Sequence, residues 1–303
     1  MMESRVLITG AGGFVGSALS TGFAALGWQV TAMDIGFDSH TADRLCGCEL
    51  ISVDLGSTAA PDLPRFDLVI HAAALTTDAE ALGITPAEHL ARNIQPLLAV
   101  TQMAALCPPG AFVFLSSSGV FDGTEGCPDL TDRCLPAGLA PYAAAKRTGE
   151  LLAVSALAGS CAVHVLRLGY IYGPDEVSRP SRARVSVVAA MIAAARAGQP
   201  LPLRSDDPRR DWTFAPDLAP AIAALVAAPA ARGPLHFGST HILHDSALAA
   251  LIARHFGTLR LSRVASTGAK PPMVASSIPA LCGFRWTPLE EGIAALCRQE
   301  VAA

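Results

Sequence analysis

Thr9-Gly-Ala-Gly-Gly-Phe-Val-Gly16 follows a short apolar run, Arg5 to Thr9, and opens a helical pattern. Its glycines at offsets zero, three and six are Gly10, Gly13 and Gly16. Glycine tolerates a tight turn, lets the backbone approach a pyrophosphate closely and allows a helix to pack against a strand. The N-terminus of the helix adds unpaired N–H groups and the positive end of a dipole. The stretch therefore predicts a strand, a phosphate-binding turn and a helix.

Short apolar runs alternate with alanine- and leucine-rich helical stretches, which predicts a parallel sheet. The runs expected to be strands are Arg5 to Thr9, Trp28 to Met33, Glu49 to Val53, Asp67 to His71, Ala111 to Ser116 and Cys161 to Arg167. They lack period-two alternation, which is typical of strands buried on both faces. We therefore expect an α/β fold with a doubly wound parallel sheet of the Rossmann type, with ligands at the carboxyl ends of its strands.

The pattern changes near residue 173, where proline and glycine become frequent. Four helical patterns follow, at 185–197, 217–228, 246–256 and 289–299, joined by irregular loops. We interpret residues 1–172 as a dinucleotide-binding domain. Residues 173–303 are expected to form a smaller, mostly C-terminal substrate-binding lobe, with some segments returning to the sheet.

The composition limits the partners and the compartment. The net charge is −4 and no basic run occurs, which argues against nucleic acid. No uninterrupted apolar segment of about 20 residues and no secretory signal pattern is found, so we expect a cytoplasmic protein without a membrane partner. The 8 cysteines form no CxxC pair and Cys46-x-Cys48 has the wrong spacing for zinc, so reduced thiols and no metal are expected.

Two carboxylates follow predicted strands. Asp34 ends the second strand, where it can accept hydrogen bonds from the hydroxyls of an adenosine ribose and would repel a 2′-phosphate. NAD is therefore favoured over NADP, although neighbouring residues can override one carboxylate. Asp54 and Leu55 close the third strand, where Asp54 could flank an adenine ring or could cap a helix.

A tyrosine and a lysine are spaced for acid/base chemistry. Tyr142 and Lys146 lie four apart, on one face of a predicted helix. A nearby ammonium stabilises a phenolate, so the pair could take a proton from an alcohol near neutral pH, and the lysine could also bind a nicotinamide ribose. The serines at 116–118 end a predicted strand at the same sheet edge, where one hydroxyl could donate to a substrate oxygen.

In this order the motifs resemble the extended short-chain dehydrogenase/reductase family, in its NAD-dependent epimerase/dehydratase branch. The matching segments are TGAGGFVG at 9–16, Asp34, Asp54-Leu55, HAAA at 71–74, Asn93, FVFLSSS at 112–118, YxxxK from 142, LRLGYIYGP at 166–174 and RDWTF at 210–214. The resemblance implies that Ser117 supplies the catalytic hydroxyl, Tyr142 is the acid/base, Lys146 is its partner and Asn93 assists a proton relay.

The resemblance also implies the ligand contacts. Cofactor-binding residues are expected at Gly10, Gly13, Phe14, Val15, Gly16, Asp34, Asp54, Leu55, Ala72, Ala73, Lys146, Tyr170 and Ile171. Substrate contacts are expected at Ser117, Ser118, Arg182 and Arg210. The helices at 86–106 and 140–158 form a homodimer interface in many relatives, so a homodimer is expected.

The residues after the catalytic hydroxyl bear on the reaction. Family members that eliminate or decarboxylate carry an extra acid or base there, whereas this chain has Ser118 and Gly119. Dehydrogenation, and epimerisation through a transient ketone with tightly held NAD, both remain open. A regulator that binds NAD without catalysis is a third alternative.

The substrate region departs from the nucleotide-sugar pattern. Tyr170 and His236 stand where asparagines would mark it, which tilts the interpretation slightly towards a dehydrogenase of a sugar, sugar acid or similar small polar substrate. Arginines crowd a region that is otherwise poor in charge, and guanidinium groups suit the capture of phosphate or carboxylate. They stand at 179, 182, 184, 204, 209 and 210. An anionic substrate is expected, and a solvated surface is the alternative for all but Arg210.

Overall fold

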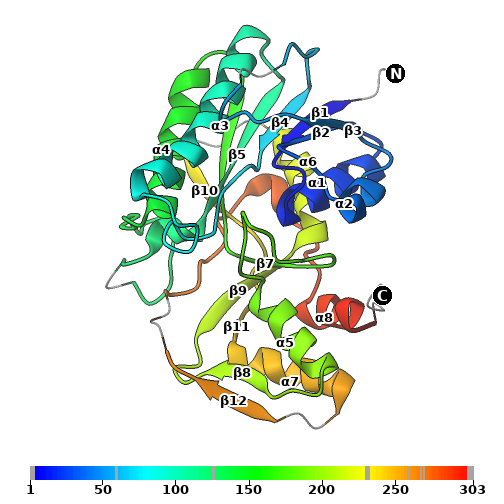
Figure 1. Cartoon of the computed structure of the whole chain (residues 1–303), viewed down its shortest axis with the longest axis vertical. Coiled ribbons are helices and arrows are strands. Elements are labelled where there is room, and N and C mark those ends of the chain that lie inside the picture. The colour runs from blue at the N-terminus through cyan, green and yellow to red at the C-terminus, as the bar shows by residue number, and fades with distance from the viewer. Residues whose placement is uncertain are drawn as a thin grey trace.

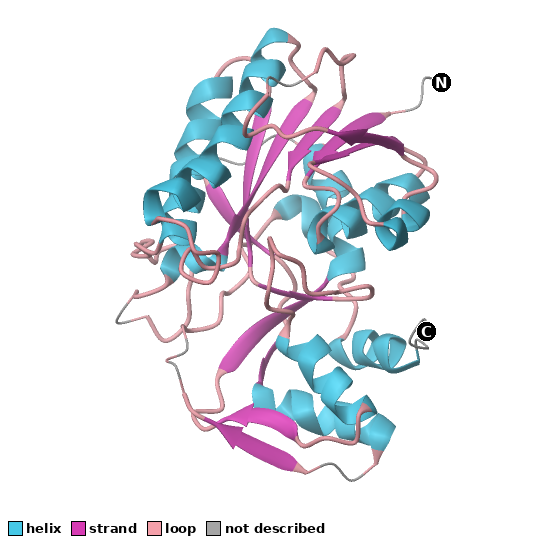
Figure 2. Ribbon diagram, viewed as in Figure 1, coloured by secondary structure: helices cyan, strands magenta, loops and turns pink. Residues whose placement is uncertain are grey.

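The structure is a computed structural model that describes residues 4–58, 61–124, 127–228, 233–257, 260–266, 268 and 270–298. Figure 1 shows a large sheet with helices on both faces, and below it a smaller lobe that carries strands and helices of its own. The two parts exchange several segments, so the boundary between them is not a single point along the chain (Figure 2).

Seven parallel strands form the large sheet in the order β10-β6-β5-β4-β1-β2-β3. Their bounds are β1 Arg5–Thr9, β2 Gln29–Asp34, β3 Glu49–Ser52, β4 Leu68–His71, β5 Ala111–Ser117, β6 Ala162–Leu168 and β10 Pro234–Phe237. The six strands expected from the sequence all form, with ends that differ by at most one residue. The doubly wound parallel sheet is therefore confirmed.

The strand order reverses between β1 and β4, which places a crevice at their carboxyl ends. The register makes these ends flush, because Thr9 pairs with Met33 of β2 and with His71 of β4. The loops that follow all three strands consequently meet at one edge.

Helices cover both faces of the sheet, which explains the lack of alternation in its strands. The α-helices of the described residues are α1 Phe14–Ala25, α2 Ser39–Arg44, α3 Pro86–Leu106, α4 Pro141–Leu157, α5 Val187–Arg196, α6 Leu218–Val226, α7 Asp245–Phe256 and α8 Leu289–Arg298. In β5, Val113 and Leu115 face the core under α1 and α6, whereas Phe112 and Phe114 face the core under α3 and α4. The four helical patterns expected in the second half appear as α5 to α8, and Gln299 lies outside the described residues.

The smaller lobe has its own core, in which Trp212 packs among side chains of α5, α7 and α8. It holds two small sheets, ordered β11-β9-β7 and β12-β8. Their strands are β7 Tyr170–Tyr172, β8 Leu201–Arg204, β9 Arg209–Phe214, β11 Ile242–His244 and β12 Leu261–Val264. From this half of the chain, β10 joins the large sheet beside β6 and α6 packs against α1.

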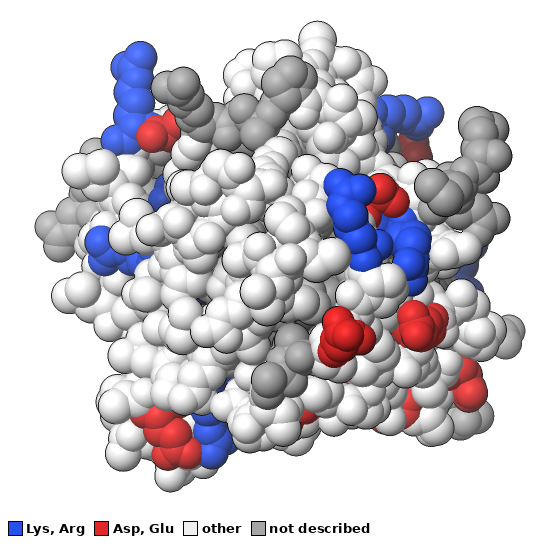
Figure 3. Space-filling view, turned by 90° about the horizontal axis from the view of Figure 1, so that it is seen from above, with Lys and Arg blue, Asp and Glu red and all other residues white. Residues whose placement is uncertain are grey.

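The surface and the helices give two further observations. Figure 3 shows one face on which uncharged residues predominate and the Lys and Arg side chains stand in small groups, several beside Asp or Glu. In the part of the chain that the structure describes, no helix is both long and apolar enough to cross a bilayer.

Candidate active site

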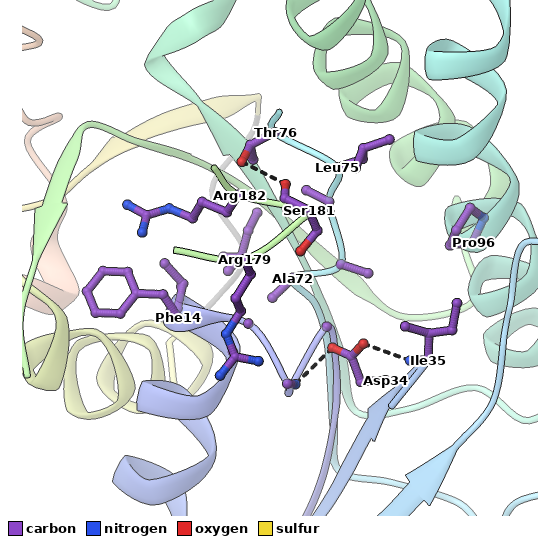
Figure 4. A pocket seen from close by; sticks show the side chains of 18 of the residues that line it. Phe14, Asp34, Ile35, Ala72, Leu75, Thr76, Pro96, Arg179, Ser181 and Arg182 are labelled. Carbon is purple, nitrogen blue, oxygen red and sulfur yellow. Dashed lines mark hydrogen bonds between the residues drawn. The ribbon is translucent and has the colours of Figure 1, made fainter. Parts of the chain in front are cut away.

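A cavity of about 1010 Å³ lies along the carboxyl ends of β1, β2, β4 and β5, where the crevice was expected. Residues lining it come from the phosphate loop, the ends of β2 and β3, the loop after β4, the end of β5, the first turn of α4 and the loop after β7. Figure 4 shows part of this lining, with Asp34 on one side of the cavity and Arg182 and Phe14 on the opposite side.

The phosphate loop needs its glycines for two different reasons. Gly10 has φ +72°, and a Cβ there would lie 2.4 Å from the backbone nitrogen of Ala73. A Cβ on Gly16 would lie 2.0 Å from the carbonyl oxygen of Gly10, so α1 can begin this close to the loop only without a side chain. Gly13 is the N-cap residue of α1. The result is a concave backbone surface at a helix N-terminus, which fits a pyrophosphate.

Asp34 is held at the end of β2 by backbone groups. Its carboxylate accepts hydrogen bonds from the N–H of Gly12, at 2.8 Å, and of Ile35, at 2.7 Å (Figure 4). Burial raises the pKa of Asp34, while those hydrogen bonds and the charge of Arg179 oppose the rise. The carboxylate is thus held at the cavity, where it could accept hydrogen bonds from the ribose of an adenosine.

Asp54 and Leu55 both line the cavity. The Asp54 carboxylate accepts from Gly56 N at 2.9 Å and from the Ser57 hydroxyl at 2.9 Å, so it also caps the turn that follows β3. The sequence left open an adenine contact or a helix cap for Asp54; the structure shows a capped turn in place of a helix, and the adenine contact stays a prediction.

Ser117, Tyr142 and Lys146 line the same cavity. Ser117 ends β5 and its Oγ accepts a hydrogen bond from Gly119 N at 3.0 Å. Tyr142 stands in the first turn of α4, and one turn later the Lys146 Nζ donates to the carbonyl of Leu115 at 2.7 Å. The Lys146 Nζ lies 5.9 Å from the centre of the Tyr142 ring. The strand end and the helix therefore bring the three side chains together.

The charges around the phenol differ from expectation. Burial raises the pKa of Tyr142, and a hydrogen bond to Ser117 and the charge of Arg182 oppose the rise. We expected the ammonium of Lys146 to be the opposing charge. Burial instead lowers the pKa of Lys146 to about 8, with Glu150 opposing the shift, and its Nζ is engaged with Leu115.

Asn93 is near the cavity but does not line it. Its Oδ1 accepts from Leu75 N at 2.9 Å, and its Nδ2 donates to Leu75 O at 3.2 Å and to His89 O at 3.0 Å. Because Leu75 does line the cavity, these hydrogen bonds of Asn93 hold the cavity-lining loop that follows β4 in place.

Several of the other residues predicted to contact the cofactor or substrate line the cavity. The residues among them that line the cavity are Phe14, Val15, Ala72, Ala73, Ile171 and Arg182. Tyr170 does not line it, because its ring faces Arg210, whose guanidinium carbon is 4.7 Å from the ring centre.

Two predicted substrate contacts are not brought to the cavity. Ser118 begins a short 3₁₀ helix after β5 and is buried away from the lining. Arg210 is buried and forms hydrogen bonds of 2.7 and 3.1 Å with the carboxylate of Asp245, so its guanidinium is already neutralised.

The arginine-rich region separates into two groups once folded. Arg184, Arg204 and Arg209, like Arg210, pair with carboxylates away from the cavity. Of the six arginines in this region, Arg179 and Arg182 line the cavity. The alternative of a solvated surface therefore remains for Arg184, Arg204 and Arg209, whereas Arg179 and Arg182 remain candidates for binding an anionic ligand.

Arg182 lines the cavity and carries an unsatisfied hydrogen-bond donor. One side of its guanidinium pairs with Glu176 at 2.5 Å, and the group lies 5.0 Å from the centre of the Phe14 ring. Its other terminal nitrogen, Nη1, is buried and has no hydrogen-bond partner among the described residues. A buried donor of this kind is costly unless a ligand satisfies it.

Sequence reasoning missed a set of cavity residues in the loop after β7 and on α3. They are Val177, Arg179, Pro180 and Ser181 from the loop, and Arg92, Gln95 and Pro96 from the helix. Arg179 was noticed only as a member of a cluster, and nothing local distinguishes the others. No group of His, Cys, Asp or Glu that could hold a metal occurs within the described ranges.

Comparisons with known proteins agree with this geometry. The model of the NAD dependent epimerase/dehydratase family matches residues 6–237. The chain is 25% identical over 297 residues to dTDP-L-rhamnose 4-epimerase of Burkholderia thailandensis, with 84% of this chain and 81% of the relative covered.

Solved structures are similar as well. MoeE5 in complex with UDP-glucose and NAD is 27% identical, with a TM-score of 0.75 and 97% of each chain covered. An epimerase from Methanothermobacter thermautotrophicus is 22% identical with a TM-score of 0.81, covering 98% of this chain and 91% of the other, and this likeness concerns the fold.

The glycine loop, the strand-end carboxylate and the Ser-Tyr-Lys group define an enzyme that uses a nicotinamide dinucleotide. The chain belongs to the NAD-dependent epimerase/dehydratase family, and its cofactor is NAD.

Proposed function

We propose that this protein epimerises a secondary alcohol carbon of a nucleotide-linked, negatively charged sugar through a transient ketone. The observation that carries the proposal is the placement of Ser117, Tyr142 and Lys146 in one cavity with the phosphate loop. A substrate held there has its alcohol next to the phenol and to the cofactor site. NAD, when bound, supplies a place for the hydride to go and to return from.

The three side chains have distinct tasks in the proposal. The Tyr142 phenolate takes the hydroxyl proton as the carbon loses its hydride, and the phenol returns the proton when the hydride adds to the opposite face. The Ser117 hydroxyl donates a hydrogen bond to the same oxygen. The Lys146 ammonium, held by the carbonyl of Leu115, places a positive charge one helical turn from the phenol. Proton and hydride are both restored, so the product is an isomer.

The distribution of carboxylates favours epimerisation over elimination. Among the described residues that line the cavity, the carboxylates are Asp34, Asp38 and Asp54. Asp34 ends β2, Asp54 follows β3 and Asp38 precedes α2, so all three belong to the adenosine end. An elimination needs a second acid or base at the sugar. The Tyr142 end offers a phenol and a hydroxyl but no carboxylate from the described lining.

The unused Nη1 of Arg182 supports an anionic sugar. Arg182 lines the same cavity as Tyr142, and its charge opposes the rise in the pKa of Tyr142. A carboxylate or phosphate would satisfy the donor. The named partners of the similar proteins, a dTDP-linked rhamnose and UDP-glucose, support the nucleotide-linked class.

A dehydrogenase of a sugar or sugar acid is the second candidate. Tyr170 stands where nucleotide-sugar members carry asparagine, and in the structure it packs on Arg210 and not in the cavity. This position therefore offers no amide to a nucleotide, which favours a smaller substrate.

An assay with NAD and a panel of UDP- and dTDP-linked hexoses and hexuronic acids, beside the free sugars and sugar acids, tests both. We expect one nucleotide-linked substrate to be converted into its epimer, which chromatography would detect. The absorbance at 340 nm should not change, because no NADH accumulates. Accumulation of NADH with a free sugar acid would instead establish the dehydrogenase. Tyr142→Phe is expected to abolish turnover, and an unchanged biological activity of this variant would favour a regulator.

A homodimer remains part of the proposal. Leu98 of α3 and Leu151 and Val154 of α4 are exposed apolar side chains on two helices that pack side by side (Figure 1). They would be covered by a second copy. Light scattering that gives the mass of one chain would contradict this part.

A further inference from the structure

Residues 174–184 form a strap, the name used below for this segment, that lies along the cavity. It follows β7, and its residues Arg179 to Arg182 line the cavity. Arg179 and Arg182 exchange backbone hydrogen bonds of 3.0 and 2.9 Å, so the strap is a closed hairpin and not a loose loop. Figure 4 shows the Arg179 side chain to the left of Asp34, and Ser181 beside Thr76.

One end of the strap is fixed to α2. The Arg179 guanidinium donates to the Thr41 hydroxyl at 2.6 Å and pairs with Asp38 at 2.8 Å. A second ion pair, 3.1 Å long, joins Arg44 to Asp175. These contacts fix the strap beside Asp34, at the adenosine end.

The other end is fixed to the loop after β4. The carbonyl of Ser181 accepts from the N–H groups of Thr76 and Thr77, at 2.8 and 3.2 Å, and from the Thr76 hydroxyl at 3.1 Å. The Thr77 hydroxyl in turn accepts from Ala183 N at 2.8 Å. The strap thus bridges the two walls of the cavity.

A ligand that reaches from Asp34 to Tyr142 would lie along this bridge, with Arg179 at one end and Arg182 at the other. We infer that the strap retains NAD between turnovers, and that Arg44 and Thr77 control how fast the cofactor leaves although neither lines the cavity. The inference rests on the proposed function, because an epimerase returns its hydride and has no need to exchange NAD, whereas a dehydrogenase must release NADH in each cycle.

Arg44 and Thr77 are positioning residues, because they would act through the strap and not on the cofactor. This makes them better probes than Arg179, which lines the cavity and could itself contact an adenosine. Arg44→Gln removes the ion pair on the α2 side, and Thr77→Val removes the acceptor on the β4 side while keeping the side chain's shape. Arg184→Gln is the matched control, because Arg184 belongs to the strap but is exposed and 3.6 Å from an exposed Asp78.

The test measures NAD release in the absence of sugar. Protein loaded with NAD is rapidly desalted, incubated for increasing times and desalted again, and the NAD still bound is quantified after denaturation. Arg44→Gln and Thr77→Val are expected to release NAD about tenfold faster than the wild type, and the double variant faster still, because each loses a charged or buried hydrogen bond. Arg184→Gln is expected to match the wild type.

Circular dichroism and the unfolding midpoint of each variant show whether it is folded, and the two single variants provide independent tests. Release of NAD from both at the wild-type rate would overturn the inference, as would loss of NAD from the wild type within the first desalting step. Because no sugar is present, this result is independent of the proposed activity: NAD retained through the strap without epimerisation of any sugar would contradict the proposed function alone.

Discussion

Arg167 of β6 and Glu150 of α4 form a buried pair, in which the Arg167 Nε and Nη2 donate to the two carboxylate oxygens at 2.8 and 2.7 Å. The Ser116 hydroxyl donates to the same carboxylate at 2.6 Å. Glu150 lies one turn beyond Lys146, and Ser116 directly precedes Ser117. The pair therefore ties together the helix and the strand end that carry the proposed catalytic side chains.

Breaking this pair should be costly. Glu150→Ala leaves the Arg167 guanidinium buried without its carboxylate, and we expect the free energy of unfolding to fall by about 3–5 kcal/mol. Denaturant unfolding measures this. The double variant Glu150→Leu with Arg167→Met buries no charge and should recover much of the loss. A single variant as stable as the wild type would show that the pair does not stabilise the fold.

Ser117 and Ser118 should differ in their effect on turnover. Ser117→Ala removes the hydroxyl that faces the cavity, and a loss of about 10²–10³-fold in kcat is expected because a donor to the developing oxyanion is missing. Ser118→Ala, one residue further and buried away from the cavity, is expected to change kcat only slightly. Steady-state kinetics of the two variants decide between them, and equal losses would show that the wrong serine was chosen.

The packing of α1 on the phosphate loop should not tolerate a methyl group. In Gly16→Ala the new Cβ meets the Gly10 carbonyl oxygen at 2.0 Å, so the loop must shift. We expect affinity for NAD to fall by about tenfold or more, as measured by calorimetric titration, because the loop N–H groups lose their alignment. Gly47→Ala is the control, since a Cβ there meets nothing within 4 Å. Wild-type affinity in Gly16→Ala would contradict the described loop.

Asp211 should give the fold a pH dependence. Burial raises the pKa of this carboxyl from 3.8 to about 6. The folded protein therefore holds a proton that the unfolded chain has already released, so the contribution is favourable at low pH and is lost as the pH rises through about 6.

The variant Asp211→Asn removes that titration. Relative to the variant, the wild type should lose about 2 kcal/mol of stability between about pH 4.5 and about pH 7.5, because one pKa unit corresponds to about 1.4 kcal/mol. Urea unfolding of both proteins at the two pH values measures the difference. The same stability difference at both pH values would refute the raised pKa.

Local patterns predicted most of the nucleotide-binding half. The strands of the large sheet are continuous apolar runs, because burial on both faces requires apolar residues at successive positions. The glycines at 10, 13 and 16 mark the phosphate loop, because its tight turn and close packing require residues without a side chain. The four-residue interval between Tyr142 and Lys146 likewise places both on one helix face.

Folding alone decided which arginines reach the cavity. The sequence favours Arg210 as a ligand-binding arginine over Arg179 and Arg182, because it stands in the RDWTF segment. In the structure Arg210 is neutralised by Asp245, whereas the other two line the cavity. It also decided which charge acts on Tyr142, because Arg182 stands 40 residues further along the chain.

The amino-acid sequence by itself predicted the sheet, the cofactor loop and the pairing of Tyr142 with Lys146 on one helix face, and the family resemblance selected Ser117. Only the tertiary structure placed the strap, where Arg179 meets Thr41 across 138 residues of chain. The physical reason is that periodicity and turn chemistry act over a few neighbouring residues, whereas the strap contacts exist only after the sheet and lobe have packed.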